Sequence, residues 1–290
     1  MAAVLLACAS AVLFGGMAVA LRFALRRFPD PELGSLVTIT VAFVVCALVA
    51  AIVSRGGSFA ISELAPFAFA GALSPGAAQL LFTRAVREAG PSRTSVAVGV
   101  APLVAVIGAI LFLGEPLRPE LAVGALLVVI GSIALVGERI RPERFRQIGL
   151  ALAFASTALF ATRDNVIRWL ATNTHVKPDV AGATSLIAGG VLLLLYVTAT
   201  RGPRALRRLD RTALRGFALP GVLFGLSYAS LFEAYYRGRV TVVSPLVATE
   251  SLWGVAFAAL ILGRTELIGK RLVSGALLIV AGGALIGATR

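Results

Sequence analysis

The chain contains ten apolar runs, each close to the length that a helix needs to cross a lipid bilayer. A bilayer core is about 30 Å thick and a helix rises about 1.5 Å per residue, so a span needs about 20 residues. The runs lack the short length and strict alternation of outer-membrane barrel strands. We therefore predict an all-α polytopic membrane protein with ten transmembrane helices. The predicted spans are 3–25, 33–54, 64–83, 94–113, 120–137, 147–170, 180–199, 214–235, 240–262 and 269–288.

An internal repeat is visible within the chain. The segment "GEPLRPELAVGALLVVIG" at 114–131 resembles "RTELIGKRLVSGALLIVAG" at 264–282, with Glu115 opposite Glu266. Near the start of each half, a Ser-x-x-Leu-Phe pattern occurs at 10–14 and again at 156–160. A sequence that repeats itself at this scale predicts a fold that repeats as well.

The repeat divides the chain into two halves of five spans each, which we place at 1–140 and 141–290. Because five is an odd number, the second half should enter the membrane inverted relative to the first. Inverted repeats are typical of secondary transporters, with the substrate site near the midplane where the halves meet.

The formal charge of +13 indicates membrane orientation rather than nucleic-acid binding, because the basic residues lie in short loops between apolar runs. Loops that follow odd-numbered spans hold 19 of the 27 basic residues, whereas the other loops and the C-terminus hold 7. The positive-inside rule places the first set in the cytoplasm and both termini outside. Arginine outnumbers lysine strongly, and Ala and Gly are abundant, which favours a GC-rich bacterium and hence its inner membrane.

Both halves close on "GE" or "TE" followed by a G-A-L-L-x-V-x-G span, and both open with a helix rich in small residues. This pattern resembles the EamA family of the drug/metabolite transporter superfamily. The resemblance implies ten helices in two inverted five-helix repeats and the export of amino acids, drugs and other small metabolites. More distant relatives of that family move nucleotide sugars or triose phosphates.

Two features depart from that family. Its members are usually drawn with both termini in the cytoplasm, opposite to the orientation that the charge count predicts here. A Trp-Gly pair is common in the opening helix, but this chain has Phe14-Gly15 and Phe160-Ala161 instead. An aromatic platform would therefore be built from Phe14 and Phe160.

Glu250 is the only charged residue between Arg239 and Arg264. A charge at the centre of a span costs about 2.5–3.5 kcal/mol and normally faces a cavity or a partner. We interpret Glu250 as a protonatable carboxylate that binds a cation or a substrate amine, or that couples transport to protons. The alternative is a neutral acid in a structural hydrogen-bonded pair. Its repeat partner is Gly99, so the charge lies on one side of the pseudo-dyad only.

The stretch "TRDN" lies within the sixth predicted span. Its apolar part, 148–161, has 14 residues and is too short to cross a bilayer, so the helix must continue through Arg163, Asp164 and Asn165. In one interpretation, Arg163 binds a carboxylate or phosphate and Asp164 is its counter-ion or a proton site. In the other, these residues snorkel or pair at the membrane interface.

Weaker candidates occupy other spans. Gln79 and Tyr228 lie at comparable depth, where they would hydrogen-bond substrate or tie helices together. Trp253 lies close to the face of Glu250 and would stack on a cation or ring, although a lone aromatic is more often packing.

Two pairs of charged residues are spaced four apart, Glu233 with Arg237 and Arg84 with Glu88. This spacing favours ion pairs on one helix face, here near span ends. We interpret both first as interfacial structure and second as candidate sites. Pro102 and Pro245 should kink the fourth and ninth spans.

These features predict a secondary transporter, most simply an exporter of small polar or amphipathic metabolites, that works by alternating access with optional coupling to protons. The alternative is a flippase or translocator for a lipid-linked sugar or a phosphorylated metabolite. A membrane enzyme fits poorly, because the one histidine, His175, lies in a loop and has no partner for metal or nucleophile chemistry. No cofactor is expected, and a monomer is sufficient for this scheme, although a dimer is compatible with it. Substrate, direction and coupling ion stay open.

Overall fold

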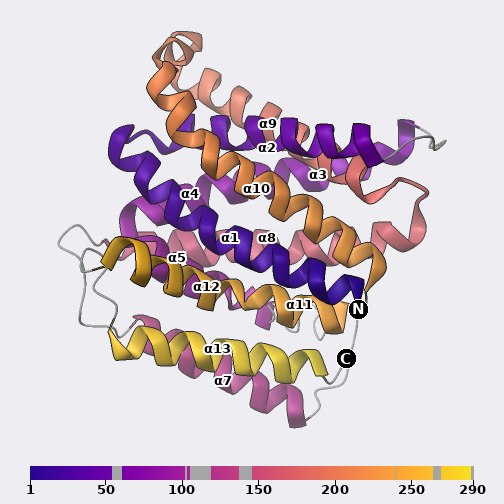
Figure 1. Ribbon diagram of the computed structural model, residues 1–290, viewed down its shortest axis with the longest axis vertical. Helices are drawn as coiled ribbons and strands as arrows, with labels where there is room; N and C mark the ends of the chain where they lie inside the picture. The colour runs from indigo at the N-terminus through magenta and orange to yellow at the C-terminus, as the bar shows by residue number, and fades with distance from the viewer. Residues whose placement is uncertain are drawn as a thin grey trace.

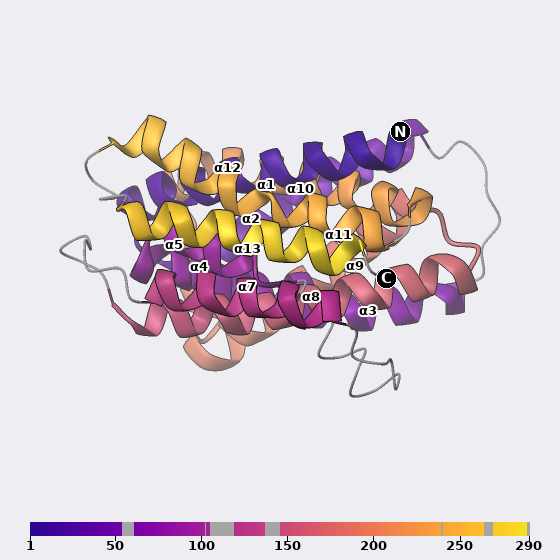
Figure 2. The ribbon, with the colours of Figure 1, turned by 90° about the horizontal axis from the view of Figure 1, so that it is seen from below.

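The computed structural model describes residues 1–53, 61–101, 103–104, 119–136, 146–238, 240–263 and 269–288. Throughout these ranges the chain forms helices and turns and no strand. The helices lie roughly side by side in stacked layers, and the view from below shows that the molecule is flattened (Figures 1 and 2). The predicted all-α class is therefore confirmed for the described residues. Glu115, Glu266 and the predicted boundary at 140/141 lie outside these ranges.

The helices follow one another in chain order. The first predicted half contains α1 (Ala2–Arg27), α2 (Pro31–Val53), η1 (Ile61–Leu64), α3 (Ala65–Gly71), η2 (Ala72–Ala77), α4 (Ala78–Ala89), α5 (Pro91–Val98) and α7 (Pro119–Val136). The second contains α8 (Ile148–Asn173), α9 (Pro178–Arg201), η3 (Pro203–Arg208), α10 (Arg211–Arg237), α11 (Val240–Ala248), α12 (Glu250–Phe257), η4 (Ala258–Leu262) and α13 (Lys270–Ala288).

Five helical segments of the described chain are long and apolar enough to cross a membrane: Ala2–Arg27, Pro31–Ile52, Ile61–Ala89, Pro178–Arg201 and Arg211–Arg237. Two shorter apolar helices are Ala122–Leu135 and Leu246–Leu262. Helix α8 has 26 residues but carries Arg163, Asp164 and Arg168. Length and composition thus support a multi-pass membrane protein, while the predicted number of ten spans is not established by this measure.

The third predicted span differs from the structure in length and shape. It extends from Ile61 to Ala89 rather than over 64–83, and it is kinked at Ser74, whose φ of −148° and ψ of 111° are not helical. The kink leaves the Ser74 carbonyl outside the regular helical ladder, where a side chain from another helix can reach it.

The fourth and ninth predicted spans are each interrupted. After α5, Gly99 adopts φ −58° and ψ −12°, and after α11, Thr249 adopts nearly the same angles, −64° and −11°. The Thr249 hydroxyl donates to the Leu246 carbonyl at 2.6 Å and the Ser251 hydroxyl to the Ala248 carbonyl at 2.9 Å. Such bonds compete with the backbone ladder of a helix. Pro245 lies within α11 just before this break, and Pro102 is outside the described residues.

Helix starts and ends follow local residue chemistry. Proline occupies the first position of α2, α5, α7 and α9, where its missing N–H is not needed. Asp30 accepts from the Leu33 N–H at 3.2 Å and Asp210 from the Ala213 N–H at 2.8 Å, so each satisfies a free donor in a first turn. Gly90 turns the chain between α4 and α5 with a φ of 86°, a conformation that other residues rarely adopt.

The first helix of each predicted half packs against the third span of the other half. The Ser10 and Ser227 hydroxyls lie 3.0 Å apart where α1 meets α10, and the Ser156 hydroxyl donates to the Ala78 carbonyl at 2.9 Å where α8 meets α4. The two halves therefore interlock rather than standing side by side.

Helices α1 and α8 run in opposite directions. At one end of the molecule, the start of α1 lies beside the end of α10, since a Cβ added at Gly238 would come within 2.8 Å of Ala3. The end of α8 lies there too, because Arg168 donates to the Tyr235 carbonyl at 2.8 Å. At the opposite end, Arg22 of α1 donates to the Arg87 carbonyl at 3.0 Å. The N-terminus and the end of α13 share the first end (Figure 1).

Helices α7 and α13 form an antiparallel pair in which the backbones touch. A Cβ added at Gly131 would lie 2.7 Å from the Gly275 carbonyl oxygen, and one added at Gly282 would lie 2.6 Å from the Gly124 carbonyl oxygen. Small residues permit such close approach between membrane helices. These four glycines belong to the G-A-L-L-x-V-x-G repeat.

A network of ion pairs joins the two predicted halves at the end where α1 stops. Arg201 at the end of α9 binds both carboxylate oxygens of Asp30 at 2.8 Å, and Arg208 lies 3.3 Å from the same carboxylate. Glu32 accepts from Arg84. Burial alone would raise the pKa of Asp30, but hydrogen bonds from Arg201 and the Leu33 N–H outweigh it and hold the pKa below its usual value.

Candidate functional site

A cavity lies between α1, α8, α10 and the break before α12, so that both predicted halves contribute to its wall. Seven of its polar side chains come from the "TRDN" stretch, the broken ninth span and α10. The lining residues are Ser10, Phe14, Val98, Ala101, Phe160, Arg163, Asp164, Phe224, Ser227, Tyr228, Leu231, Tyr235, Ser244, Val247, Ala248 and Glu250.

Arg163 and Asp164 form an ion pair inside this cavity. The Arg163 Nε and Nη2 atoms donate to Asp164 Oδ1 at 2.9 and 2.7 Å. The Tyr235 hydroxyl donates to the other carboxylate oxygen at 3.2 Å. The Arg163 side chain is only 6% exposed, so it does not snorkel to the interface. The ion pair, which both interpretations of this stretch allowed, is present and lines the cavity.

The guanidinium of Arg163 also lies between two aromatic rings. Its central carbon is 5.0 Å from the ring centre of Phe160 and 5.1 Å from that of Tyr228. Cation–π contacts of this length add to the ion pair and fix the plane of the guanidinium. The cation is therefore part of the cavity wall rather than a mobile group.

Glu250 is the first residue of α12 and is 7% exposed. Within the described residues, no group hydrogen-bonds or ion-pairs with its carboxylate, although Arg163 and Asp164 line the same cavity. With all three groups ionised, these residues would give the cavity two carboxylates and one guanidinium, and the guanidinium is already paired with Asp164. Glu250 is thus the acidic group with free capacity for a cation. The structural-pair interpretation of Glu250 finds no partner among the described residues.

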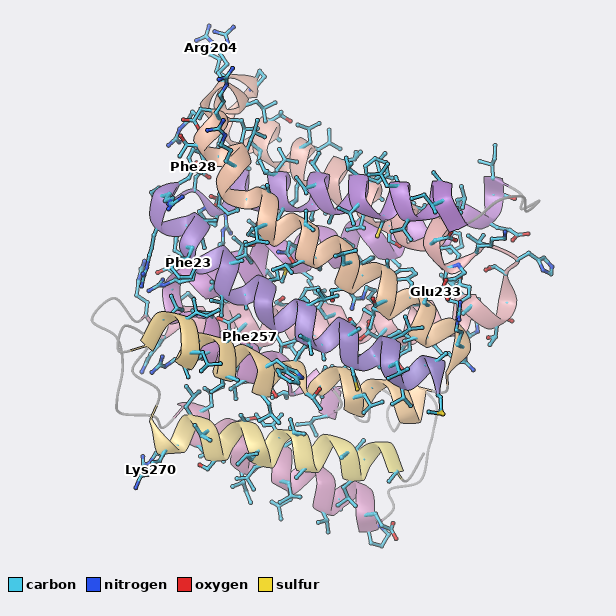
Figure 3. The ribbon with its side chains drawn as sticks, in the orientation of Figure 1. Phe23, Phe28, Arg204, Glu233, Phe257 and Lys270 are labelled. Carbon is cyan, nitrogen blue, oxygen red and sulfur yellow. The ribbon has the colours of Figure 1, made fainter. Side chains whose placement is uncertain are left out.

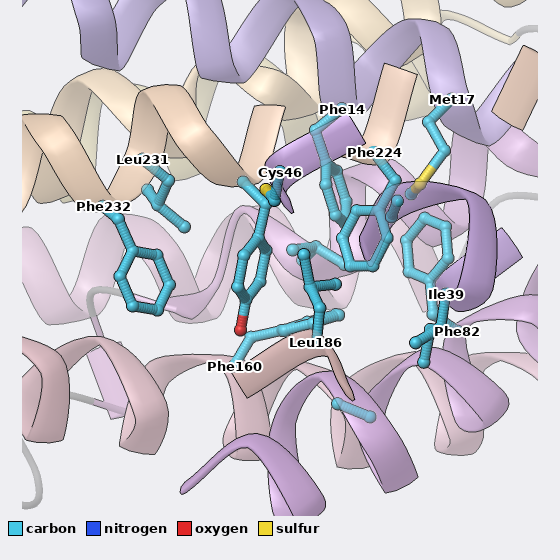
Figure 4. Packing of buried hydrophobic residues seen from close by; sticks show 14 of the residues in the cluster. Phe14, Met17, Ile39, Cys46, Phe82, Phe160, Leu186, Phe224, Leu231 and Phe232 are labelled. Atoms are coloured by element: carbon cyan, nitrogen blue, oxygen red, sulfur yellow. The ribbon is translucent and has the colours of Figure 1, made fainter. Parts of the chain in front are cut away.

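Aromatic rings form the apolar side of the cavity. The Phe14 ring lies 5.7 Å from that of Phe160 and 6.1 Å from that of Phe224, measured between ring centres in edge-to-face contacts. Phe14 also contacts Phe82 at 5.0 Å. Figure 4 shows Phe14 and Phe224 side by side within this cluster. Phe14 and Phe160, the residues at the Trp-Gly positions of the family, meet across the two halves.

Tyr228 lines the cavity and also makes a hydrogen bond to another helix. Its ring lines the cavity and faces Arg163, while its hydroxyl donates to the Ser74 carbonyl at 3.3 Å. The kink at Ser74 supplies this acceptor. Tyr228 therefore ties α10 to the kinked third span and forms cavity wall at the same time.

Three sequence candidates lie away from the cavity. Gln79 is fully buried. Among the described residues, its side chain makes one hydrogen bond, a long one of 3.5 Å from Nε2 to the Thr83 hydroxyl. Trp253 is 40% exposed and packs on Phe257, with 5.9 Å between ring centres. Asn165 is exposed and donates to the Ala161 carbonyl of its own helix at 3.0 Å.

The two predicted helical ion pairs have different outcomes. Glu233 and Arg237 pair at 2.7 Å near the end of α10, as their spacing indicates (Figure 3 labels Glu233). Arg84 does not pair with Glu88. Arg84 binds Glu32, and Glu88 binds Arg87 and Arg146. The acid-before-base order is the more favourable one on a helix, and only the first pair has it.

Five residues of α10 line the cavity, and only Tyr228 among them was predicted from the sequence. Phe224, Ser227, Tyr228, Leu231 and Tyr235 all face the cavity. They recur at spacings of three and four, which place them along one face of a helix. That periodicity was present in the sequence, but only Tyr228 was singled out. Tyr235 is the most important of the residues that were not predicted, because its hydroxyl donates a hydrogen bond to the Asp164 carboxylate.

The cavity is narrow in this conformation. The space that the centre of a water molecule can occupy is about 30 Å³, which is room for about two or three waters. A metabolite could enter only if the surrounding helices separate. Within the described residues, no group of three or more His, Cys, Asp and Glu side chains could hold a metal ion.

Comparison with known proteins supports the membrane fold and names a family. A protein of known crystal structure superposes with a TM-score of 0.68 at 18% identity, over 99% of both chains, which at this identity concerns the fold alone. No curated protein matches. The model of the EamA-like transporter family matches twice, over residues 1–137 and 147–288. The chain therefore belongs to the EamA-like transporter family, part of the drug/metabolite transporter superfamily.

Proposed function

We propose that this chain is a secondary transporter that exports small amphipathic metabolites bearing an amine, amino acids or amine drugs among them, across a bacterial inner membrane. In this proposal ten helices form two inverted repeats of five, divided near residue 140. The loops rich in arginine face the cytoplasm, both termini face outward, and a monomer is sufficient. The opposite directions of α1 and α8 and the interlocked packing support this arrangement.

The observation that carries the proposal is the Glu250 carboxylate, which has no partner among the described residues and lies in a cavity lined by both halves. An amine or a proton would neutralise it, since the one guanidinium there is bound to Asp164. Phe14, Phe160 and Phe224 would contact the apolar part of the substrate. Aromatic and carboxylate groups together suit an amphipathic cation.

Alternating access follows from the narrowness of the cavity. The helices around it must separate toward one side to admit substrate and toward the other to release it. The breaks at Gly99 and Thr249 lie within one residue of equivalent places in the two halves, since Gly99 is the repeat partner of Glu250. Discontinuous helices near the midplane are a common feature of transporters with inverted repeats. Glu250 follows one of these breaks, so that movement there would change its surroundings.

Proton coupling in this scheme takes place at Glu250 rather than at Asp164. Asp164 is occupied by Arg163 and Tyr235, whereas Glu250 would bind a proton and a substrate amine in turn. The flippase alternative has less support. Arg163 is bound to Asp164, Arg168 to the Tyr235 carbonyl and Arg84 to Glu32, so none of the three is held ready for a lipid phosphate.

The experiment compares Glu250→Gln with Glu233→Gln, which removes a carboxylate near the end of α10 in the same half. A thermal-shift panel of amino acids, amine drugs, sugars and nucleotides first identifies a ligand, since stabilisation grows with ligand concentration over Kd. Uptake into proteoliposomes is then measured from pH 5.5 to 8.5. We expect Glu250→Gln to lower transport at least ten-fold and to abolish its pH dependence, with Glu233→Gln unchanged. Full pH-dependent transport by Glu250→Gln would refute the role of this residue.

A further inference from the structure

The segment that joins α9 to α10 carries more positive charge than its surroundings neutralise. Arg204, Arg207, Arg211 and Arg215 are exposed, and none has a hydrogen bond or ion pair within the described chain. The nearby acids are engaged elsewhere. Asp30 binds Arg201 and Arg208, and the Asp210 carboxylate accepts from the Ala213 N–H. We call these four arginines the basic corner.

Packing holds the basic corner in place. The η3 turn buries Ala205 and partly buries Leu206 and Leu209 against Leu33 and Val197. Its apolar residues thus face the protein and its arginines face outward. Figure 3 shows Arg204 projecting at the corner where one end of the helices meets the outer edge of the molecule. In a bilayer, such a corner lies at the depth of the lipid headgroups.

The outward face of α10 next to these arginines is apolar. Leu219 and Val222 are 59% and 37% exposed, and they lie four and seven residues after Arg215, on the face of α10 that Arg211 also occupies. A basic group directly above an exposed apolar strip matches a molecule with a charged head and hydrocarbon chains. A soluble anion would need only the arginines.

We propose that the basic corner binds the phosphate headgroup of an anionic phospholipid, whose acyl chains lie on Leu219 and Val222. Guanidinium groups bind phosphate oxygens in pairs, and each basic residue near an anionic membrane surface adds to the attraction. The site is separate from the cavity and does not depend on what the chain transports.

The test uses purified full-length protein in detergent and titrates phosphatidylglycerol against phosphatidylcholine with the same acyl chains, reading the thermal unfolding temperature. We expect phosphatidylglycerol to raise it more, and the excess to fall as salt rises. Changing all four arginines to Gln should weaken the apparent affinity for phosphatidylglycerol at least ten-fold. The matched Lys variant, which keeps the charge, should retain most of it.

Three results would overturn the proposal. The first is an equal response of the unaltered protein to the two lipids, and the second is an unchanged affinity in the Gln variant. The third is an equal shift with inorganic phosphate, which would make the basic corner a site for free anions. If the Gln variant does not fold, the comparison of lipids, phosphate and salt on the unaltered protein still decides.

Discussion

At the scale of single residues, Arg163 is held from three sides, by Asp164 and by two rings. Asp164 in turn is held by Tyr235. Each group satisfies its neighbour, which is the condition under which charges are tolerated in a low-dielectric interior. Glu250 is outside this chain of contacts, so that, within the part of the chain that the structure describes, one acid of the cavity has a fixed partner and the other has none.

Replacing Arg163 by Met should leave the Asp164 carboxylate buried without its cation. Breaking a buried pair in this way costs roughly 3–5 kcal/mol, so the unfolding temperature in detergent should fall clearly. The double variant Arg163→Met with Asp164→Asn should recover most of that loss, because neither charge is left unpaired. A double variant no more stable than Arg163→Met alone would mean that the two side chains are not coupled.

Much of the cavity could be predicted from single residues, because charge within an apolar run is a strong signal. Glu250, Arg163 and Asp164 stand out for that reason, and all three line one cavity. Trp253 does not line the cavity with Glu250. Helix α1 approaches α12 closely at Gly15, and the indole lies outside the cavity, packed on Phe257. Tyr235 carried no such signal, because tyrosine is common near span ends.

At the scale of elements, the ion-pair network around Asp30 joins the turn between α1 and α2 to the end of α9. By the repeat, Asp30 corresponds to Lys177 and Arg84 to Ala234, so the opposite end of the molecule does not have the same residues. The network therefore strengthens the contact between the halves at the end that the arginine-rich loops share.

The Asp30 carboxylate should stabilise the fold in a pH-dependent way. Its pKa is below the usual value in the folded protein, so its contribution is present above about pH 4, the unfolded value, and is lost as the pH falls through the lower, folded one. Asp30→Asn should cost about 1.5–3 kcal/mol at pH 7. The difference in unfolding temperature between the variant and the unaltered protein should shrink below pH 4, and a difference independent of pH would contradict this.

Apolar runs predicted where the helices lie but not where they break. The segments on both sides of Thr249 are equally apolar, so hydropathy gives no sign of the interruption between them. The break depends on the hydroxyls of Thr249 and Ser251, which hydrogen-bond to nearby carbonyls. The kink at Ser74 is different, because it lies directly before Pro75, and the residue before a proline is disfavoured in the helical region. That kink therefore has a local sequence signal, although hydropathy does not report it.

At the scale of the whole molecule, close helix contacts depend on glycines at particular positions. Gly131→Ala places a Cβ 2.7 Å from the Gly275 carbonyl oxygen, and overpacking of this kind costs about 1–3 kcal/mol. The matched control is Gly216→Ala in α10, where the new Cβ would be 3.9 Å from Ala24. Alanine has a higher helix propensity than glycine by up to about 1 kcal/mol at both positions, so only the close contact at Gly131 distinguishes the two substitutions.

We expect the unfolding temperature to fall for Gly131→Ala and to stay level or rise for Gly216→Ala. Equal effects at the two positions would show that the α7–α13 contact does not depend on close backbone approach. Double variants with Gly275→Ala would then report whether the two glycines act on the same contact, since neighbouring substitutions are not additive.

The repeat predicted two related halves, but not that they exchange partners. A match of one segment to another reports common ancestry and gives no information on which copy touches which. Hydroxyl contacts such as Ser10 with Ser227, and Ser156 with the Ala78 carbonyl, show that each half packs its first helix on the other. The small residues buried on both sides of each contact permit this arrangement, but composition alone does not say which helices meet.

The glycine contacts of α7 and α13 have a consequence for how such a chain can change over time. Gly124 corresponds to Gly275 in the repeat, yet it touches Gly282, and Gly131 touches Gly275. Each copy of the motif is therefore the binding surface of the other, as in a symmetric dimer encoded by one chain. A substitution inherited by one copy alters the environment of a different position in its duplicate. Over this stretch the two copies are not free to diverge independently.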